Sequence, residues 1–153
     1  MSFNAGILSS LPEGLILLDG GMGQELIKRK ASGEGVLWSA KALFDHPEAV
    51  VAIHEDYIRA GADVITTNSY ACIRNNFESE GLADRLGEMN RLSAELAHRA
   101  RDTCDKPVLI AGSMGPQRGS YRPDLVGNYA ETEALYREQA EFLGPYEIGR
   151  AHV

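Results

Sequence analysis

A single carboxylate, Asp19, follows the apolar run Leu15–Leu18 and precedes the glycines Gly20 and Gly21. A short apolar run bounded by glycine predicts a strand buried on both faces, so Asp19 is expected where that strand ends. Its carboxylate could cap the following helix. It could also receive a substrate ammonium, while the N–H groups of Gly20, Gly21 and Met22 receive a carboxylate. Together these groups suit the zwitterion of an α-amino acid, and Asp19 could serve both roles.

Polar side chains also follow two further predicted strands. Thr66, Thr67, Asn68 and Ser69 come after the β-branched run that begins at Asp63, and Ser113 follows the apolar run 108–111. Asn and Ser favour turns, so turn chemistry alone is one interpretation. The other is that the carboxyl ends of parallel strands form a ligand site, as in α/β barrels, with these groups on the same edge as Asp19.

The elements that position these residues alternate between strand and helix. Helical spacing and end signals predict helices after each strand, with a long glycine-containing loop at 112–127. The predicted strands are 15–18, 63–67 and 108–111, and the predicted helices are 23–30, 47–60, 82–100 and 128–143. Such alternation favours an α/β fold with a parallel sheet. Three strands do not complete a domain of this kind, so we expect the N-terminal part of a (βα)8 TIM barrel, about three βα units, truncated before strand four.

The last seven residues, 147–153, lack hydrophobic periodicity and stand where a fourth strand is due. One possible coding sequence for them resembles a common sequencing-library adapter read in frame. We therefore expect residues 1–146 to be a partial barrel domain. Residues 147–153 are expected to be a non-native, adapter-derived tail, and the fold prediction leaves them out.

Composition excludes several classes of protein. The chain has 153 residues and a net charge of −7, and its basic residues are scattered, which argues against nucleic-acid binding. No apolar run approaches the roughly 20 residues of a membrane span, and the N-terminus does not resemble a signal peptide. Cys72 and Cys104 are too few and too far apart for a disulfide framework, which predicts free thiols and a cytoplasmic protein.

Three common ligand-binding or catalytic motifs are incomplete or absent in this sequence. Gly21 and Gly23 could open a dinucleotide fingerprint, but Leu26 stands at the third glycine position. His54 precedes a glutamate as in zinc proteases, but Ile58 stands where the second histidine is required. No Gly-Lys-Ser/Thr is present, which excludes a phosphate-binding P-loop.

Taken in order, several segments resemble the homocysteine S-methyltransferase family. Each segment alone is weak, but the ordered set covers nearly all of residues 13–143. The segments are Leu-Asp-Gly-Gly-Met-Gly (18–23), Leu-Trp-Ser-Ala (37–40), the run from His46 to Asp63, Thr-Thr-Asn-Ser-Tyr (66–70) and Ala-Gly-Ser-Met-Gly-Pro (111–116). The segment 37–40 is most similar to the branch that takes its methyl group from S-methylmethionine or S-adenosylmethionine.

The resemblance implies a methyltransferase of methionine biosynthesis built on a (βα)8 barrel, with residues 1–146 as a partial homocysteine-binding barrel domain. In the family, zinc binds the homocysteine thiol and stabilises the thiolate, which attacks the methyl group of a sulfonium donor. On this chain the resemblance places Asp19 at the substrate ammonium, with Gly20 and Gly21 beside the backbone end of homocysteine. It places Thr67, Asn68 and Tyr70 near the thiol and metal. Ser113 would line the mouth of the third strand.

One departure from the family concerns the metal. The family's zinc ligands are three cysteines late in the barrel, which the chain does not reach, and neither Cys72 nor Cys104 matches them. We expect no zinc bound to this chain, and no activity from it. Two alternatives stay open: a barrel lyase or aldolase, which requires a lysine at a strand end, and a non-catalytic half-barrel module. The sequence does not predict the oligomeric state.

Overall fold

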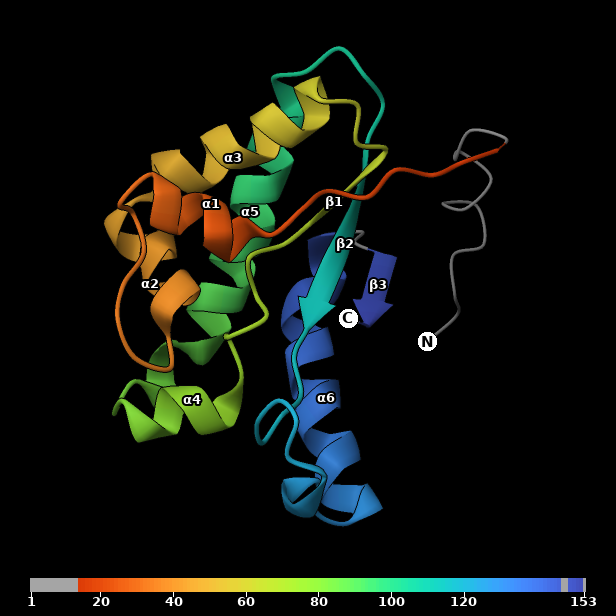
Figure 1. Cartoon of the computed structure of the whole chain (residues 1–153). Coiled ribbons are helices and arrows are strands. Elements are labelled where there is room, and N and C mark those ends of the chain that lie inside the picture. The colour runs from red at the N-terminus through yellow and green to blue at the C-terminus, as the bar shows by residue number, and fades with distance from the viewer. Residues whose placement is uncertain (1–13, 147–148, 153) are drawn as a thin grey trace.

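The computed structural model describes residues 14–146 and the backbone of residues 149–152 (Figure 1). Short 3₁₀ helices lie at Ala83–Arg85, Pro123–Leu125 and Gly144–Tyr146. The helices are α1 (Met22–Lys28), α2 (Trp38–Asp45), α3 (Pro47–Arg59), α4 (Arg74–Ser79), α5 (Leu86–Asp102) and α6 (Tyr129–Leu143). The strands are β1 (Val64–Thr66), β2 (Leu109–Met114) and β3 (Gly149–His152).

The sheet is parallel and its strands follow chain order, β1-β2-β3. Val64 pairs with Leu109, and Ala111 pairs with Gly149. On the outer side of β1, Leu18 forms a parallel bridge with Val64. The structure therefore confirms the mixed α/β class and the parallel arrangement, with all strand carboxyl ends at one edge.

The prediction of a doubly buried first strand over 15–18 is wrong. Only Leu18 forms a bridge, and Leu15, Leu17 and Leu18 expose 98%, 54% and 55% of their surface. The segment is nevertheless fixed on one side, because Leu17 N–H donates to Asp63 Oδ2 at 2.9 Å and Leu17 O accepts from Asp63 N–H at 2.7 Å. In the described part of the chain it has a strand neighbour on the β1 side only (Figure 1). The exposed fractions of Leu15, Leu17 and Leu18 show that the faces of this segment are uncovered as well.

Four further elements differ from the prediction. β2 runs to Met114, so Ser113 lies inside a strand and not in the loop after it, because residues 111–114 pair with β3. β3 itself lies within residues 147–153, which the fold prediction left out. The helices α2 and α4 were not predicted. The sequence of α4 has little hydrophobic periodicity, because Phe77 is the one buried residue among the six of this helix.

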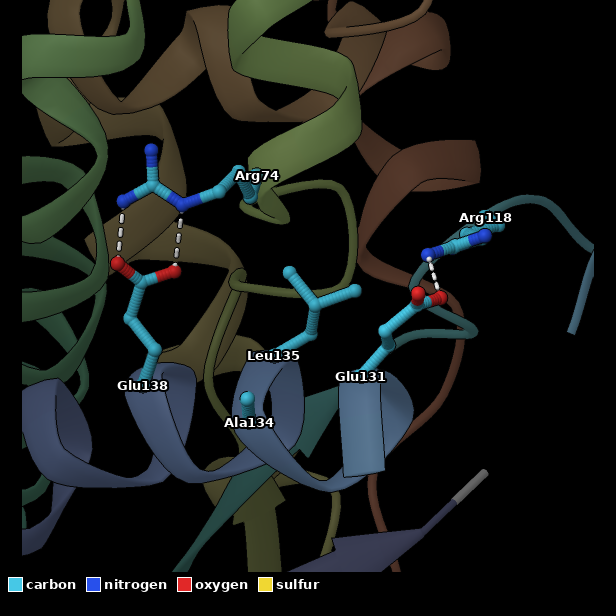
Figure 2. Close-up of a pocket in the computed structure, with 6 residues that line it drawn as sticks. All are labelled: Arg74, Arg118, Glu131, Ala134, Leu135 and Glu138. Atoms are coloured by element: carbon cyan, nitrogen blue, oxygen red, sulfur yellow. Dashed lines mark hydrogen bonds and ion pairs between the residues drawn. The ribbon is translucent and has the colours of Figure 1, made fainter. Parts of the chain in front are cut away.

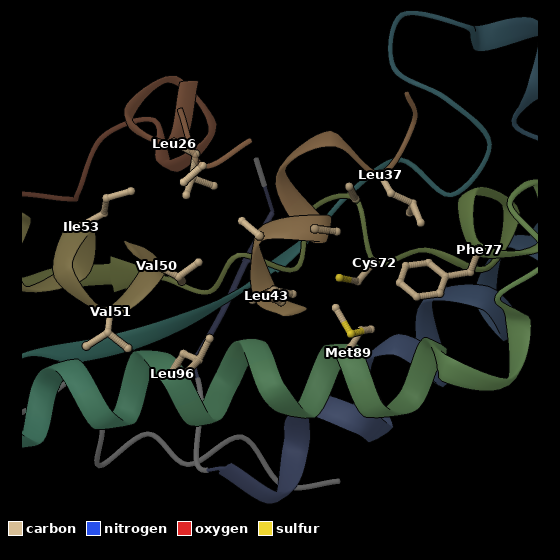
Figure 3. Packing of buried hydrophobic residues seen from close by; sticks show 14 of the residues in the cluster. Leu26, Leu37, Leu43, Val50, Val51, Ile53, Cys72, Phe77, Met89 and Leu96 are labelled. Carbon is tan, nitrogen blue, oxygen red and sulfur yellow. The ribbon is translucent and has the colours of Figure 1, made fainter. Parts of the chain in front are cut away.

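The main hydrophobic core lies among the helices, to one side of the sheet. Figure 3 shows Leu26, Leu43 and Val50 of α1, α2 and α3 directed toward α5, whose Met89 and Leu96 face them. A second cluster joins α3 and α5 to the strands: Ile58, Ala62, Ile65, Ala97, Val108 and Ile110. The helices thus hold β1 and β2 from one side and fix the position of their carboxyl ends. In the described part of the chain, none of the helices combines the length and apolar character needed to cross a bilayer.

Candidate functional site

Asp19 lies at the carboxyl edge of the sheet and is bound by Thr66. Thr66 N–H donates to Asp19 Oδ2 at 2.7 Å, and the Thr66 hydroxyl donates to Oδ1 at 2.8 Å. Burial raises the pKa of the Asp19 carboxyl, and the two hydrogen bonds from Thr66 oppose that rise. The carboxylate makes no capping bond to α1, so the interpretation of Asp19 as a helix cap is wrong. Asp19 joins its own segment to the end of β1.

The glycines after Asp19 allow close approach of a neighbouring side chain. A Cβ on Gly20 would lie 2.8 Å from Tyr57 Oη, so a side chain at this position would require the Tyr57 ring of α3 to move. Gly21 is the N-cap residue of α1 and provides no side-chain cap. The first N–H groups of the helix therefore face the Asp19 edge without a capping side chain.

Thr67 and Ser113 connect the ends of β1 and β2. Thr67 Oγ1 accepts from Ser113 N–H at 3.0 Å and lies 2.7 Å from Ser69 Oγ. Ser69 Oγ donates its hydrogen to Ser113 O at 2.7 Å, so Thr67 is the donor in the Thr67–Ser69 pair. Thr67 and Ser113 are both buried. The Thr67 hydroxyl thus donates one hydrogen bond and accepts another, and both bonds hold the two strand ends together.

Asn68 and Tyr70 point in different directions from the same turn. The Asn68 carboxamide is buried and donates to Ser39 O of α2 at 2.8 Å. Tyr70 is exposed, and its hydroxyl lies 2.6 Å from Ser120 Oγ in the loop after β2. Of the predicted site residues, Thr67 is hydrogen-bonded to Ser113. Asp19 is hydrogen-bonded to Thr66, the residue before Thr67. Asn68 is directed toward α2, and Tyr70 lies at the surface.

Sequence reasoning missed the residues that support this edge. Thr66 was assigned to a strand end with no specific partner, yet it holds Asp19. Gln117, Gln139 and Asn90 are buried and hydrogen-bonded to one another or to the strand-end loops. The sequence did contain one signal for Asn90, which lies on the same helical face as the buried Leu86 and Met89 of α5. A polar residue on an apolar helix face indicates a buried hydrogen bond.

A separate hollow lies along α6 and is lined by two ion pairs (Figure 2). Arg74 Nε lies 2.7 Å from Glu138 Oε2, and Arg118 Nη2 lies 2.8 Å from Glu131 Oε2. Figure 2 shows Leu135 between the two pairs. Each guanidinium is balanced by a carboxylate of α6, so the hollow has no net charge with which to select an anion or a cation.

The described residues do not form a metal site. Among them no group of three or more His, Cys, Asp or Glu side chains comes together in a way that could hold an ion. Burial raises the pKa of the Cys72 thiol to about 12, which disfavours the thiolate that a metal requires. Cys104 lies just after the end of α5 and belongs to a different part of the core.

Together, the fold and this edge define a parallel α/β protein whose candidate ligand groups lie at the carboxyl ends of its strands. A family model described as homocysteine S-methyltransferase matches residues 16–149. The chain belongs to the homocysteine S-methyltransferase family.

Known relatives are longer than this chain. It is 38% identical over 141 residues to the Bacillus subtilis homocysteine S-methyltransferase YbgG, covering 83% of this chain and 44% of that protein. It is 36% identical over 138 residues to the Astragalus bisulcatus selenocysteine methyltransferase, covering 75% of this chain and 40% of the relative. The crystal structure of the metallated Escherichia coli homocysteine methyltransferase MmuM superposes with a TM-score of 0.82 at 33% identity, covering 97% of this chain and 56% of that one. The chain spans about half the length of the relatives it matches.

Proposed function

We propose that this chain carries the amino-acid-binding part of a homocysteine S-methyltransferase, and that its parallel sheet corresponds to about three βα units of a (βα)8 barrel. Family membership and the likeness to MmuM support the activity and the barrel. The observation that carries the site is Asp19, a half-buried carboxylate fixed by Thr66 at the carboxyl edge of the sheet.

In this proposal Asp19 binds the ammonium of homocysteine. Thr66 holds both carboxylate oxygens, which fixes the plane of the carboxylate before the ligand arrives. Charge-assisted hydrogen bonds of this kind are stronger than neutral ones, and partial burial reduces competition from water. The N–H groups at Gly20 and Gly21 receive the substrate carboxylate, for which the absence of a side-chain cap on α1 leaves room. The thiol end lies beside the turn after β1, which carries Thr67, Asn68 and Tyr70, and beside Ser113 at the end of β2.

The reaction proposed for the whole protein is transfer of a methyl group to a thiolate. The homocysteine sulfur forms a bond to the methyl carbon of S-methylmethionine or S-adenosylmethionine as the donor's C–S⁺ bond breaks. The electron pair of that bond stays on the donor sulfur, so the products are methionine and a neutral thioether. The chain's own residues contribute binding and orientation of the acceptor.

Zinc, which the family resemblance implies, finds no fitting ligand set among the described residues. Cys72 is buried, its thiol pKa is raised, and Cys104 lies elsewhere in the core. We propose that this chain alone binds homocysteine without transferring a methyl group to it. Methyl transfer by the purified 153-residue chain, with or without added zinc, would contradict that part of the proposal.

Of the two alternatives, a lyase or aldolase needs a lysine at the carboxyl ends of the strands. Lys106 precedes β2, and its Nζ is bound to Gly61 O at 2.6 Å and to Asp63 Oδ1 at 2.8 Å, at the opposite edge of the sheet. This position gives the lyase interpretation no support. A non-catalytic module is distinguished from the proposed function by whether the chain recognises homocysteine.

The test is a titration of the ¹⁵N-labelled chain with L-homocysteine, followed through its backbone amides. We expect saturable shifts at Gly20, Gly21 and Thr66, and loss of at least about tenfold in affinity for Asp19→Asn, as for a lost charged hydrogen bond. The analogue 4-mercaptobutanoate, which lacks the ammonium, should bind the original chain as weakly as homocysteine binds the variant. Asp84→Asn, an exposed site elsewhere, is the matched control. Absence of saturable binding, or equal binding by Asp19→Asn, would overturn the proposal.

A further inference from the structure

We propose that Gln139 is a positioning residue for the candidate site, because its buried carboxamide joins the loop after β1, the end of β2 and helix α5. The inference rests on the proposed function, since the loops that Gln139 joins carry Thr67 and Ser113. Gln139 comes from α6, on the side of the helix that packs against the strands, and it is only 2% exposed.

The nitrogen of this carboxamide faces four oxygen acceptors. Gln139 Nε2 lies 3.0 Å from Ser69 O, 3.2 Å from Cys72 O, 3.3 Å from Asn90 Oδ1 and 3.4 Å from Ser113 O. Two hydrogens are shared among these acceptors, and the two shortest contacts take the larger part. The reverse orientation of the amide would set its oxygen against four oxygens, so the network itself determines which way the side chain points.

The oxygen of the carboxamide is held by a second glutamine. Gln117 Nε2 donates to Gln139 Oε1 at 2.8 Å and to Gly115 O at 3.2 Å. Gly115 in turn packs against the backbone of Tyr70, too closely for any side chain at that position. Through Gln117, Gln139 therefore also fixes the start of the long loop after β2, opposite Tyr70.

The hydrogen bonds of Gln139 lie next to those that fix the positions of Thr67 and Ser113. Ser69 and Ser113 each present a backbone carbonyl to Gln139, and the same two residues are joined by the Ser69 Oγ to Ser113 O bond. Ser113 N–H completes the group by donating to Thr67 Oγ1. Removing Gln139 would take one donor from each of these buried carbonyls, although Ser69 O keeps the Cys72 N–H and Ser113 O keeps the Ser69 hydroxyl. It would also remove the side chain that bridges the two carbonyls, which favours separation of the two strand ends.

The experiment compares Gln139→Met with the original 153-residue chain by ¹⁵N NMR and hydrogen exchange. Methionine keeps the length and removes the hydrogen bonds. We expect the Ser113 amide, which is bonded to Thr67, to shift and to exchange at least about tenfold faster. Amides in the middle of α3 should be unchanged, which separates repositioning from general loss of stability. Glu141→Met, on the exposed side of the same helix, should change neither.

If Gln139→Met does not fold, Gln117→Met takes its place. That variant keeps the Gln139 nitrogen contacts and removes the donor to its oxygen, so faster exchange is expected at Gly115 and in the loop after it. A folded Gln139→Met with unchanged Ser113 exchange would overturn the inference, as would a Gln117→Met chain with unchanged exchange at Gly115.

Homocysteine titration of the same samples separates this inference from the proposed function. The dissociation constant should rise about tenfold in Gln139→Met, the equivalent of one net hydrogen bond. Failure of the original chain to bind homocysteine would refute the proposed function, while the Ser113 amide would still decide the role of Gln139. Unchanged affinity in a variant whose Ser113 amide has moved would refute the positioning role alone.

Discussion

Thr66 donates to both oxygens of the Asp19 carboxylate, at 2.7 Å from its backbone N–H and at 2.8 Å from its hydroxyl. Asp19 N–H completes the connection by donating to Val64 O at 2.9 Å. The segment that ends at Asp19 is therefore tied to β1 through the side chain that is proposed to bind the substrate ammonium.

Thr66→Val tests whether the hydroxyl keeps Asp19 ionised. Burial already raises the pKa of Asp19, and the Thr66 hydroxyl opposes it by stabilising the anion. Removing that donor should therefore raise the pKa further, as measured by ¹³C NMR titration of the carboxyl group. Thr66→Ser retains the hydroxyl and should leave the pKa where it is. A fall in the pKa of Asp19 in Thr66→Val would contradict the assignment.

Asp19→Asn should separate stability from binding. The pKa of Asp19 in the folded chain lies above its ordinary value. As the pH rises from the ordinary value through the raised one, the unfolded chain ionises first, so the folded state loses stability. The neutral amide removes this cost, so at neutral pH the variant is expected to be at least as stable in urea unfolding while binding homocysteine less well. A large loss of stability would show that the carboxylate is structural.

Gly115→Ala should be destabilising because of Tyr70. A Cβ at position 115 would collide with the Tyr70 carbonyl oxygen, which is backbone and moves only with its loop. Overpacking of this kind costs about 1–3 kcal/mol, measured as the free energy of unfolding in urea. Gly144→Ala is the matched control, since it has open space and a helical φ of −56°. There the substitution should be neutral or slightly stabilising.

The uncovered segment 15–18 predicts association of the chain. Leu15 and Leu17 are 98% and 54% exposed, beside a strand edge with which no other described residue pairs, and this arrangement promotes pairing between molecules. Sedimentation velocity should detect concentration-dependent association, and Leu15→Lys combined with Leu17→Lys should reduce it. Val126→Lys, at another exposed apolar site, should not. A chain that stays monomeric at every concentration would contradict this prediction.

Local patterns were sufficient for the elements with strong periodicity. The predicted helices at 47–60, 82–100 and 128–143 correspond to α3, α5 and α6, and Asn128 caps α6 by accepting from Glu131 N–H. Burial of 15–18 could not be predicted from its composition, because burial depends on which neighbours a strand has. The length of β2 depends on pairing with β3, and the bond from Gln139 to Ser69 spans 70 positions. Such contacts are set by tertiary packing and leave no local pattern.

His54 should make the stability of the chain depend on pH. It is fully buried in α3, neither ring nitrogen has a hydrogen-bond partner among the described residues, and burial lowers its pKa to about 4. The unfolded chain therefore binds a proton near the ordinary pKa of 6.5 that the folded chain does not bind. Stability is lost as the pH falls below that value, by about 2 kcal/mol between pH 7 and pH 5. His54→Leu, which leaves no buried polar atom at this position, should remove that slope in urea unfolding, whereas His46→Gln, at an exposed site, should retain it. An equal pH slope in His54→Leu and the original chain would show that His54 is not the group responsible.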